Sequence, residues 1–384
     1  MSRTYRILSL DGGPAAPSYL RMLRHIERAR PGFLDAVDMF AGTSDGAWAA
    51  VFLASRPKDM PALAALDAVI AFNERVVGAI RPGLVGVARL VSGMRSAIEN
   101  DRVLAELTQA CGVGPSGEPI KLGELNRDVA LVTFRVRTGA NKPGAHIYHN
   151  LGRERPGHKP QAWMGDTEDL RNLDFGAAEI ALRSGSVPIL MPVRDGHVDG
   201  GLFANNPSMC GLSQLLRHRK LRDVDGPEDV VLLSCGADQA STGGSDANNQ
   251  FFNRDNVSWG WIAWLFSPRS PMLLLETVIS AGGRGVAFQT HQFLQERFLR
   301  LALPGALGTG DELLRLLDGQ SGRIFTAADR QADQWAAGRE GIAFRPDFHA
   351  TTTWIKDHWE DAAPTTTRAR ANRPQTSQST GTEN

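Results

Sequence analysis

Residues 8–20 read LSLDGGPAAPSYL, and this stretch begins the part of the chain that determines the fold. The apolar run at 5–10 predicts a buried strand, two glycines follow it at once, and 19–28 then carries apolar residues at helical spacing. A glycine pair between a strand and a helix typically offers backbone N–H groups to an anion. Pro14 and Pro17 interrupt this loop, and proline has no N–H to donate.

Strand and helix signals alternate along the rest of the chain. The predicted strands are 36–41, 129–136 and 230–234, and the predicted helical regions are 47–54, 61–110, 175–182 and 272–318. Residues 137–170, rich in glycine, proline, histidine and charge, indicate a long excursion without regular structure. Short apolar strands that alternate with helices predict a three-layer α/β/α sandwich with a mainly parallel central sheet.

The composition excludes several classes of protein. The chain has 384 residues, enough for a large core, and its 42 Lys and Arg balance its 42 Asp and Glu. A formal net charge of +0 removes the electrostatic reason to expect nucleic acid as a partner. The three cysteines, Cys111, Cys210 and Cys235, form no CxxC pair, so we expect neither a zinc site nor a disulfide framework.

The sequence predicts no targeting or membrane-spanning segment. The apolar run before Asp11 is too short for a signal peptide, and no stretch approaches the length of a bilayer span. The tryptophan-rich run at 257–266 would suit a water–lipid interface, although a buried aromatic segment is the favoured interpretation. Residues 364–384 are polar and predict a disordered tail. We therefore expect a cytoplasmic protein.

A second motif is the run from Gly42 to Gly46, GTSDG, which fits the pattern G-x-S-x-G around Ser44. The bare pattern is common, but here an apolar strand precedes it and a helix of small residues follows, as a nucleophile elbow requires. Such a turn exposes the serine hydroxyl beside a helix N-terminus, whose partial positive charge favours a developing anion. The context therefore indicates a nucleophilic serine.

A third motif is Asp199-Gly200-Gly201, in the segment HVDGGLFANNP. An aspartate before two glycines at a strand end is a common turn in itself. Its functional interpretation is a carboxylate held on a tight turn, with room for another backbone beside it. The functional interpretation gains support because this motif follows the other two along the chain.

Together the three motifs resemble the patatin-like phospholipase family, whose pattern is D-G-G-G-x-R-G, then G-x-S-x-G, then D-G-G or D-G-A. They occur here in that order, beginning at Asp11, Gly42 and Asp199. The flanks ILSLDGG, ALRSGSVPILMPV and HVDGGLFANNP are also similar to the family. The resemblance implies a patatin-like domain over 5–320 that ends in a helical extension, with a core of about 5–215. A C-terminal extension at 321–363 and the tail would follow.

The resemblance implies a lipid acyl hydrolase of the phospholipase A type, a serine hydrolase with a Ser–Asp dyad and no metal or cofactor. Ser44 would be the nucleophile and Asp199 the base, with an acyl-serine intermediate that water resolves. An ordinary aspartate, with a pKa near ~3.9, is a weak base, so burial and a hydrogen bond would have to tune it. Phospholipids or other lipid esters would be the substrates, with peripheral membrane contact.

In the family the glycine-rich loop supplies N–H groups to the oxyanion, and the resemblance assigns that role here to Gly12, Gly13 and Asp45. The loop departs from the family pattern at three positions: Pro14 and Pro17 stand where the family has glycine, and Ala16 stands where it has arginine. Loss of one oxyanion donor typically lowers a rate about 10²–10³-fold. Pro17 can also simply open the helix that follows.

Two alternatives follow. The first is a catalytically impaired member of the family that binds lipid or a partner, as the altered loop suggests. The second is an α/β-hydrolase with a catalytic histidine, for which His291, His349 and His358 lie late enough in the chain. No sequence context marks any of these histidines.

Overall fold

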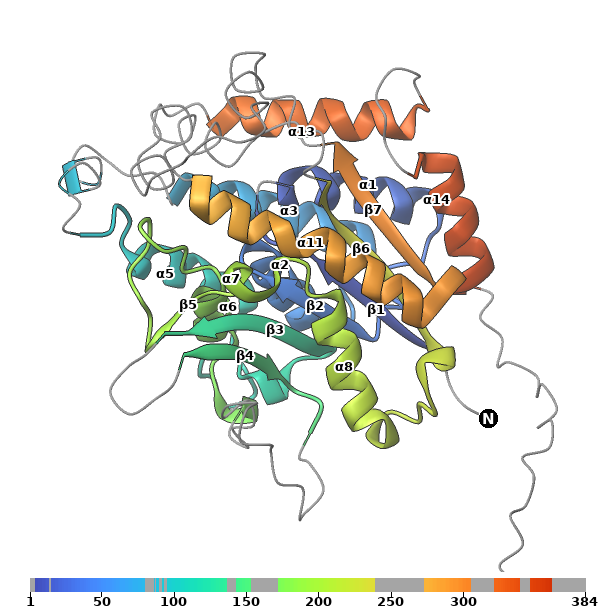
Figure 1. Ribbon diagram of the computed structural model, residues 1–384, viewed down its shortest axis with the longest axis horizontal. Coiled ribbons are helices and arrows are strands. Elements are labelled where there is room, and N and C mark those ends of the chain that lie inside the picture. The colour runs from blue at the N-terminus through green and yellow to red at the C-terminus, as the bar shows by residue number, and fades with distance from the viewer. Residues whose placement is uncertain are drawn as a thin grey trace, which may run out of the picture.

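A mostly parallel sheet forms the centre of the structure, a computed structural model that describes residues 4–13, 15–79, 86, 88, 89, 92, 95–136, 143–152, 172–238, 273–304, 321–338 and 346–360. Within these ranges the sheet has seven strands in the order β4-β3-β2-β1-β6-β7, with β5 paired to β3 (Figure 1). The strands are β1 (Tyr5–Leu10), β2 (Met39–Thr43), β3 (Asp128–Arg135), β4 (Gly144–His149), β5 (His197–Asp199), β6 (Val230–Asp238) and β7 (Phe298–Pro304). Only β4 and β5 run antiparallel to their neighbour among these strands.

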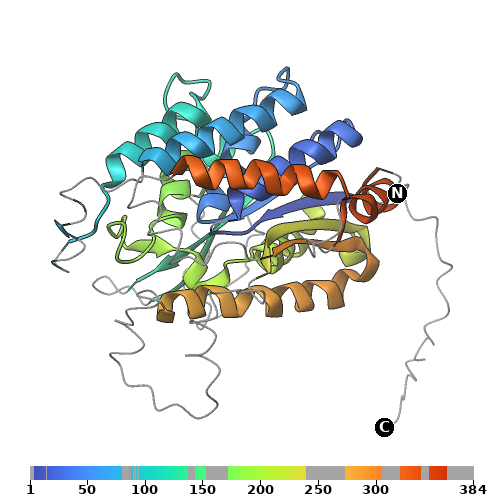
Figure 2. The same ribbon diagram turned by 90° about the horizontal axis from the view of Figure 1, so that it is seen from above.

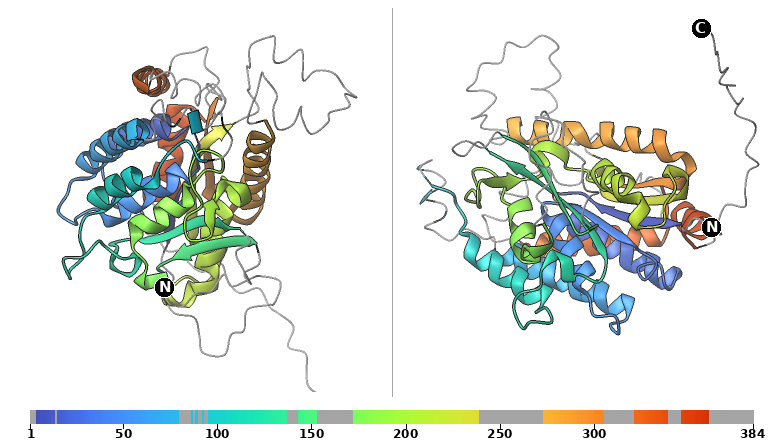
Figure 3. Two further views of the ribbon diagram at one scale, coloured as in Figure 1. Left: turned by 90° about the vertical axis from the view of Figure 1, so that its left-hand side faces the viewer. Right: turned by 90° about the horizontal axis from the view of Figure 1, so that it is seen from below.

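Helices cover both faces of the sheet, as Figures 2 and 3 show for α13 on one side and α11 on the other. The first side has α1 (Ala16–Ala29), α2 (Asp45–Ser55), α3 (Ala62–Ala79), α5 (Asn100–Cys111), α6 (Ala177–Ser184) and α13 (Ser321–Ala336). The other side has α8 (Ser208–His218) and α11 (Leu273–Leu294). Shorter elements are α7 (Gly201–Ala204), α14 (Phe348–Trp354), a π-helix at Ile355–Glu360, and 3₁₀ turns at Leu122–Glu124, Asn172–Asp174, Arg219–Leu221, Pro227–Asp229 and Gln295–Arg297. The three-layer α/β/α architecture predicted from the sequence is confirmed.

Two hydrophobic cores, one on each face of the sheet, explain why the central strands read as continuous apolar runs. In β1, Leu8 and Leu10 point into the larger core with α1, α2 and α3. Tyr5 and Ile7 point to the opposite face and join the smaller core with α8. Side chains of a strand alternate between faces, so a strand covered on both sides needs apolar residues at nearly every position.

Two sequence expectations need correction, and three others fall on residues outside the described ranges. The excursion expected at 137–170 contains β4, which pairs antiparallel with β3, and the helical region expected at 272–318 contains β7 after α11. The segment 257–266, the tail at 364–384 and Pro14 lie outside the described residues. The proposed domain boundaries stay a prediction, but α13 packs on α1, and Arg21 of α1 bonds to Asp329 at 2.5 Å.

A buried ion pair joins the first strand to the last. Asp11, directly after β1, is 2% exposed, and its carboxylate accepts a hydrogen bond of 2.8 Å from Arg300 of β7. Burial raises the pKa of Asp11, and the guanidinium of Arg300 opposes that shift. The contact spans β6, where a Cβ on Gly236 would lie 2.1 Å from the Asp11 carboxylate. The pair therefore fixes the start of the glycine-rich loop across three strands.

We expect Arg300→Met to destabilise the protein by about 3–5 kcal/mol, because it leaves the Asp11 carboxylate buried without its countercharge. Thermal unfolding measures the loss, and the double variant Asp11→Asn/Arg300→Met should recover part of it. The exposed Lys220 supplies a control, since Lys220→Met should change stability by less than about 0.5 kcal/mol. Equal unfolding temperatures for Arg300→Met and Lys220→Met would contradict this account.

Candidate active site

Ser44 lies on a sharp turn between β2 and α2. Its backbone has φ of 56° and ψ of −127°, a left-handed conformation that is strained for any residue with a side chain. A Cβ on Gly42 would lie 2.6 Å from the Cα of Ala47. A Cβ on Gly46 would lie 2.2 Å from the carbonyl oxygen of Leu10. Both glycines of the G-x-S-x-G pattern are thus required by close contact between backbones.

The hydroxyl of Ser44 donates a hydrogen bond of 2.6 Å to Oδ2 of Asp199. Asp199 ends β5, and its other carboxylate oxygen accepts the N–H of Gly201 at 2.7 Å. A Cβ on Gly200 would lie 2.1 Å from the carbonyl oxygen of Val132, so the D-G-G motif needs its first glycine for space. The structure therefore brings together the two side chains that the sequence predicted as nucleophile and base.

The Ser–Asp pair is shielded from water. Ser44 is 9% exposed and Asp199 is 2% exposed. Burial raises the pKa of Asp199 to about 6, while the hydrogen bonds from Ser44 and Gly201 act in the opposite direction. At neutral pH the carboxylate is therefore ionised, yet more basic than an ordinary aspartate, which is what proton abstraction near pH 7 requires.

A turn at residues 184–186 holds the backbone on both sides of the pair. Ser184 Oγ accepts the N–H of Ser44 at 2.9 Å and donates to the carbonyl oxygen of Val132 at 2.6 Å. The carbonyl oxygen of Ser186 accepts the N–H of Asp199 at 2.9 Å. The sequence reasoning missed this turn. Its only signal was the pair of serines in the flank ALRSGSVP.

The glycine-rich loop lies against Ser44, since a Cβ on Gly12 would be 2.8 Å from the Cβ of Ser44. The N–H of Gly12 donates to the carbonyl oxygen of Asn205 at 3.1 Å. The N–H of Gly13, a residue with φ of 93°, donates to Oδ1 of Asp45 at 2.9 Å. The N–H groups predicted to bind an oxyanion are thus close to the serine, and each of these two already has an acceptor.

Other residues considered in the sequence have structural partners elsewhere. Arg21 is 2% exposed and bonds to Glu74 of α3 and Asp329 of α13, so it ties three helices together. Pro17 lies in the first turn of α1, as expected for a proline that opens a helix. His197 contacts the hydroxyl of Tyr148 at 3.3 Å, and burial lowers its pKa to about 4. Its imidazole is therefore neutral at pH 7.

Two of the three histidines of the triad alternative lie beside aromatic rings. The ring of His291 lies 6.5 Å from that of Phe298, and the ring of His358 lies 5.5 Å from that of Trp354. His349 belongs to α14, far along the chain from β2. Among the described hydrogen bonds of the Ser44 hydroxyl, the partner is a carboxylate and not an imidazole. The geometry favours a dyad over a triad.

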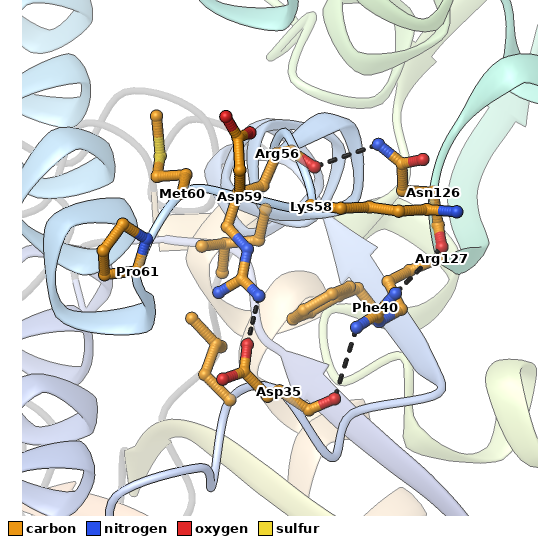
Figure 4. A pocket seen from close by; sticks show the side chains of 11 residues that line it. Asp35, Phe40, Arg56, Lys58, Asp59, Met60, Pro61, Asn126 and Arg127 are labelled. Atoms are coloured by element: carbon orange, nitrogen blue, oxygen red, sulfur yellow. Dashed lines mark hydrogen bonds and ion pairs between the residues drawn. The ribbon is translucent and has the colours of Figure 1, made fainter.

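A cavity of about 390 Å³ lies near the opposite end of β2, lined by Phe40, Leu53 and the residues shown in Figure 4. Arg56, which follows α2, forms an ion pair with Asp35 there. The side chain of Asn126 donates to the carbonyl oxygen of Arg56 at 3.0 Å. These contacts join the loops that precede β2 and β3 to the end of α2. The cavity is therefore separate from Ser44, which follows the carboxyl end of β2.

Across the described ranges, no helix combines the length and the apolar character that crossing a bilayer requires. The same ranges contain no group of three or more His, Cys, Asp or Glu arranged to hold a metal ion. Cys111, Cys210 and Cys235 are buried and unpaired. Burial raises the pKa of Cys111 and of Cys210 to about 12, so these thiols stay protonated at neutral pH.

We expect Ser184→Ala to slow the reaction of Ser44 with a fluorophosphonate by at least about tenfold, because Ser44 loses the acceptor of its N–H and its strained backbone can relax. The matched control is Ser186→Ala, which also removes a fully buried hydroxyl, but one that bonds to the carbonyl oxygen of Leu182. Labelling rates and unfolding temperatures of both variants are compared. If Ser184→Ala labels as fast as Ser186→Ala, the Ser184 hydroxyl does not position Ser44.

Comparison with known proteins identifies the family. The family model described as "Patatin-like phospholipase" matches residues 8–209, just over half of the chain, and the match includes Ser44 and Asp199. Two curated relatives, each called "Patatin-like protein 2", come from Oryza sativa subsp. indica and subsp. japonica. Each is 28% identical over 135 residues, which cover 30% of this chain and 31% of the relative. The chain thus aligns with about a third of the length of these relatives.

Solved structures with similarity to this chain include ExoU of Pseudomonas aeruginosa in complex with SpcU and VipD of Legionella pneumophila. ExoU is 14% identical with a TM-score of 0.30, over 86% of this chain and 53% of its own. VipD is 12% identical with a TM-score of 0.29, over 94% of this chain and 80% of its own. Because the family model matches more than half of the sequence, the chain belongs to the patatin-like phospholipase family.

Proposed function

We propose that the protein is a lipid acyl hydrolase of the phospholipase A type, with Ser44 as nucleophile and Asp199 as base. The observation that carries the proposal is the 2.6 Å hydrogen bond from the Ser44 hydroxyl to the buried carboxylate of Asp199. The strained turn at Ser44 and the raised pKa of Asp199 support it, since both features are typical of a reactive serine and its base. Family membership supports a lipid ester as the substrate.

In the first half of the reaction, Asp199 takes the hydroxyl proton as Ser44 Oγ attacks the carbonyl carbon of the ester. The tetrahedral intermediate collapses, and the bond from the carbonyl carbon to the alcohol oxygen breaks. The protonated Asp199 gives its proton to the leaving alcohol, which for a phospholipid is the lysophospholipid. The acyl group remains attached to Ser44.

In the second half, water replaces the alcohol. Asp199 takes a proton from the water as its oxygen attacks the acyl carbonyl carbon. The bond to Ser44 Oγ then breaks, Ser44 regains its proton from Asp199, and the fatty acid leaves. The same carboxylate thus acts as base and then acid in each half, so its pKa should lie near the working pH.

The oxyanion of each intermediate needs N–H donors, for which we propose Gly12, Gly13 and Asp45. The N–H of Gly13 must then leave the Asp45 carboxylate, which accepts it at 2.9 Å in this structure. The N–H of Gly12 must leave or share the carbonyl oxygen of Asn205. Arg300 contributes indirectly, because it balances the charge of Asp11 immediately before the loop.

The same contacts favour a second candidate, a family member that binds lipid without hydrolysing it. The Asp45 carboxylate, bonded to Gly13 N–H, places negative charge beside the position where an oxyanion would develop. Persistent occupation of that N–H would leave the intermediate without one donor. The two candidates differ in a single result, which is turnover by the wild-type protein.

We expect the wild-type protein to release fatty acid from mixed phospholipid vesicles and Ser44→Ala to release none, because the acyl group then has no acceptor oxygen. Vesicle binding by both proteins is measured in parallel by sedimentation. Binding without release by the wild type would reject the hydrolase and support the second candidate. Release by Ser44→Ala would show that another residue is the nucleophile.

A second prediction concerns pH. The base form of Asp199 is required, and its pKa is about 6, so kcat/KM on an uncharged ester should fall about tenfold per unit as the pH drops below 6. Asp199→Asn should abolish turnover at every pH. A rate that stays constant from about pH 8 down to about pH 4 would contradict Asp199 as the base.

Stability supplies the control for the Asp199→Asn variant. A carboxyl group whose pKa is raised on folding stabilises the fold most below its unfolded pKa of about 4, and that contribution is lost as the pH rises through about 6. At pH 8 the wild type therefore bears the full cost of the buried charge. Asp199→Asn should unfold at the same temperature as the wild type or above it, so its inactivity would not reflect misfolding.

A further inference from the structure

Three large apolar side chains project into solvent from the segments that flank Asp199. Ile189 is 59% exposed, Val193 is 52% exposed and Phe203 is 52% exposed. Single exposed apolar residues are normal on a protein surface. These three, however, fall within fifteen residues of sequence around one buried aspartate. We call them the apolar rim.

The loop that carries Ile189 and Val193 is closed at its base by the site itself. The N–H of Asp199 donates to the carbonyl oxygen of Ser186 at 2.9 Å, so the loop leaves and returns at the Ser–Asp pair. Met191 of the same loop is only 5% exposed, which anchors the loop on the core. Ile189 and Val193 therefore point outward from a fixed loop.

Phe203 lies on the other side of the aspartate, in α7, four residues beyond Asp199. The strand β5 pairs with the last residues of β3, from Thr133 to Arg135, and Ser44 follows the last residue of β2. Since β2 and β3 are parallel, their carboxyl ends share one edge of the sheet. The apolar rim thus lies at the same end of the sheet as Ser44, the carboxyl ends of the strands, where ligands bind in open α/β sheets.

The backbone at Ile189 is strained in a way that packing of its side chain does not explain. Its φ is 76°, a left-handed value that is unfavourable for a β-branched residue. Asparagine or glycine would fit this position better, and the exposed isoleucine gains little from contacts within the chain. A strained, solvent-exposed isoleucine indicates that its apolar side chain has a use outside the folded chain.

Two arginines near the rim are paired with carboxylates. Arg194 bonds to Glu179 at 2.9 Å, and Arg183 bonds to Asp195 at 2.8 Å. The positive charges of Arg183 and Arg194 are therefore matched by carboxylates and do not favour an anionic partner. The surface fits a partner that is apolar beneath a layer without net charge, which describes a zwitterionic phospholipid bilayer.

We propose that Ile189, Val193 and Phe203 insert into the boundary between head groups and acyl chains of a phospholipid bilayer and hold the Ser44 edge against it. The inference rests on the proposed function for its substrate but concerns binding, not chemistry. It accounts for the exposed apolar side chains on both sides of Asp199 in the sequence and for the strain at Ile189. Attraction to the bilayer comes from apolar burial and should be insensitive to salt.

The test is sedimentation with phosphatidylcholine vesicles, using the triple variant Ile189→Asn/Val193→Ser/Phe203→Ser. Its partition into vesicles should fall at least about tenfold, since three apolar side chains no longer enter the bilayer. Asparagine tolerates a positive φ, so the change at position 189 relieves strain and should not unfold the protein. Wild-type binding should be equal in low salt and in about 0.5 M salt.

The matched control is Leu221→Ser, which removes an equally exposed apolar side chain far from the rim. Leu221 is 53% exposed and precedes Arg222, whose guanidinium bonds to Asp128 at the amino end of β3. Leu221→Ser should bind vesicles as the wild type does. Hydrolysis of a soluble short-chain ester should be the same in the wild type, the control and the triple variant.

Each outcome bears on the proposal. Loss of vesicle binding in the triple variant alone, with soluble ester hydrolysis intact, supports it. Wild-type binding that is absent, or unchanged in the triple variant, overturns it. A wild-type dimer that the triple variant converts to monomers, without vesicle binding, would assign the rim to a second copy and also overturn it. Rim-dependent vesicle binding without any ester hydrolysis would reject the hydrolase while leaving the rim as a lipid-binding surface.

Discussion

The backbone of Ser44 is the constraint on which the rest of the site depends. A left-handed serine between a strand and a helix is unstable by itself, so the surrounding structure must hold it. Gly42 and Gly46 allow the backbone of other segments to approach it, and Ser184 accepts its N–H. With the turn held, the hydroxyl donates to the carboxylate of Asp199. The strained turn thus orients the nucleophile toward its base.

The two carboxylates that flank the glycine-rich loop have different partners. Asp11 lies before the loop, and Arg300 pairs with it. Asp45 lies beyond it, and its carboxylate accepts the N–H of Gly13. Any anion that forms at this loop must therefore compete with a resident carboxylate. In a hydrolase this competition would raise the barrier to the tetrahedral intermediate unless the bound ester displaced the carboxylate from the Gly13 N–H.

The sequence predicted those parts of the fold and site that depend on local patterns. β1, β2, β3 and β6 are mainly apolar, because both faces of the sheet are covered, and each was expected. β4 was missed because GAHIYH alternates polar and apolar residues, and β5 because three residues carry no periodic signal. β7 was missed because Arg300 interrupts its apolar run directly after a long helix.

The candidate site divides in the same way. Ser44 and Asp199 were predicted because glycines mark the turns on which they lie, and glycine requirements are local. Ser184, Asn205 and Arg300 were not predicted, since each acts through a contact with a segment far away in the sequence. A hydroxyl that accepts a distant N–H leaves no pattern in its own neighbourhood. Long-range hydrogen bonds of this kind emerge only in three dimensions.

The ion pair between Asp11 and Arg300 shows that the segment matched by the family model is shorter than the segment that folds together. The match to the family ends at residue 209, before β6 and β7. A fragment cut there would retain the Ser–Asp pair and the loop, yet it would lack two strands and the cation that neutralises Asp11. Its first strand would become a sheet edge with a bare carboxylate at its end. The segment matched by the family model is therefore a poor choice for expression by itself, because the arginine that neutralises Asp11 is encoded about ninety residues beyond its end.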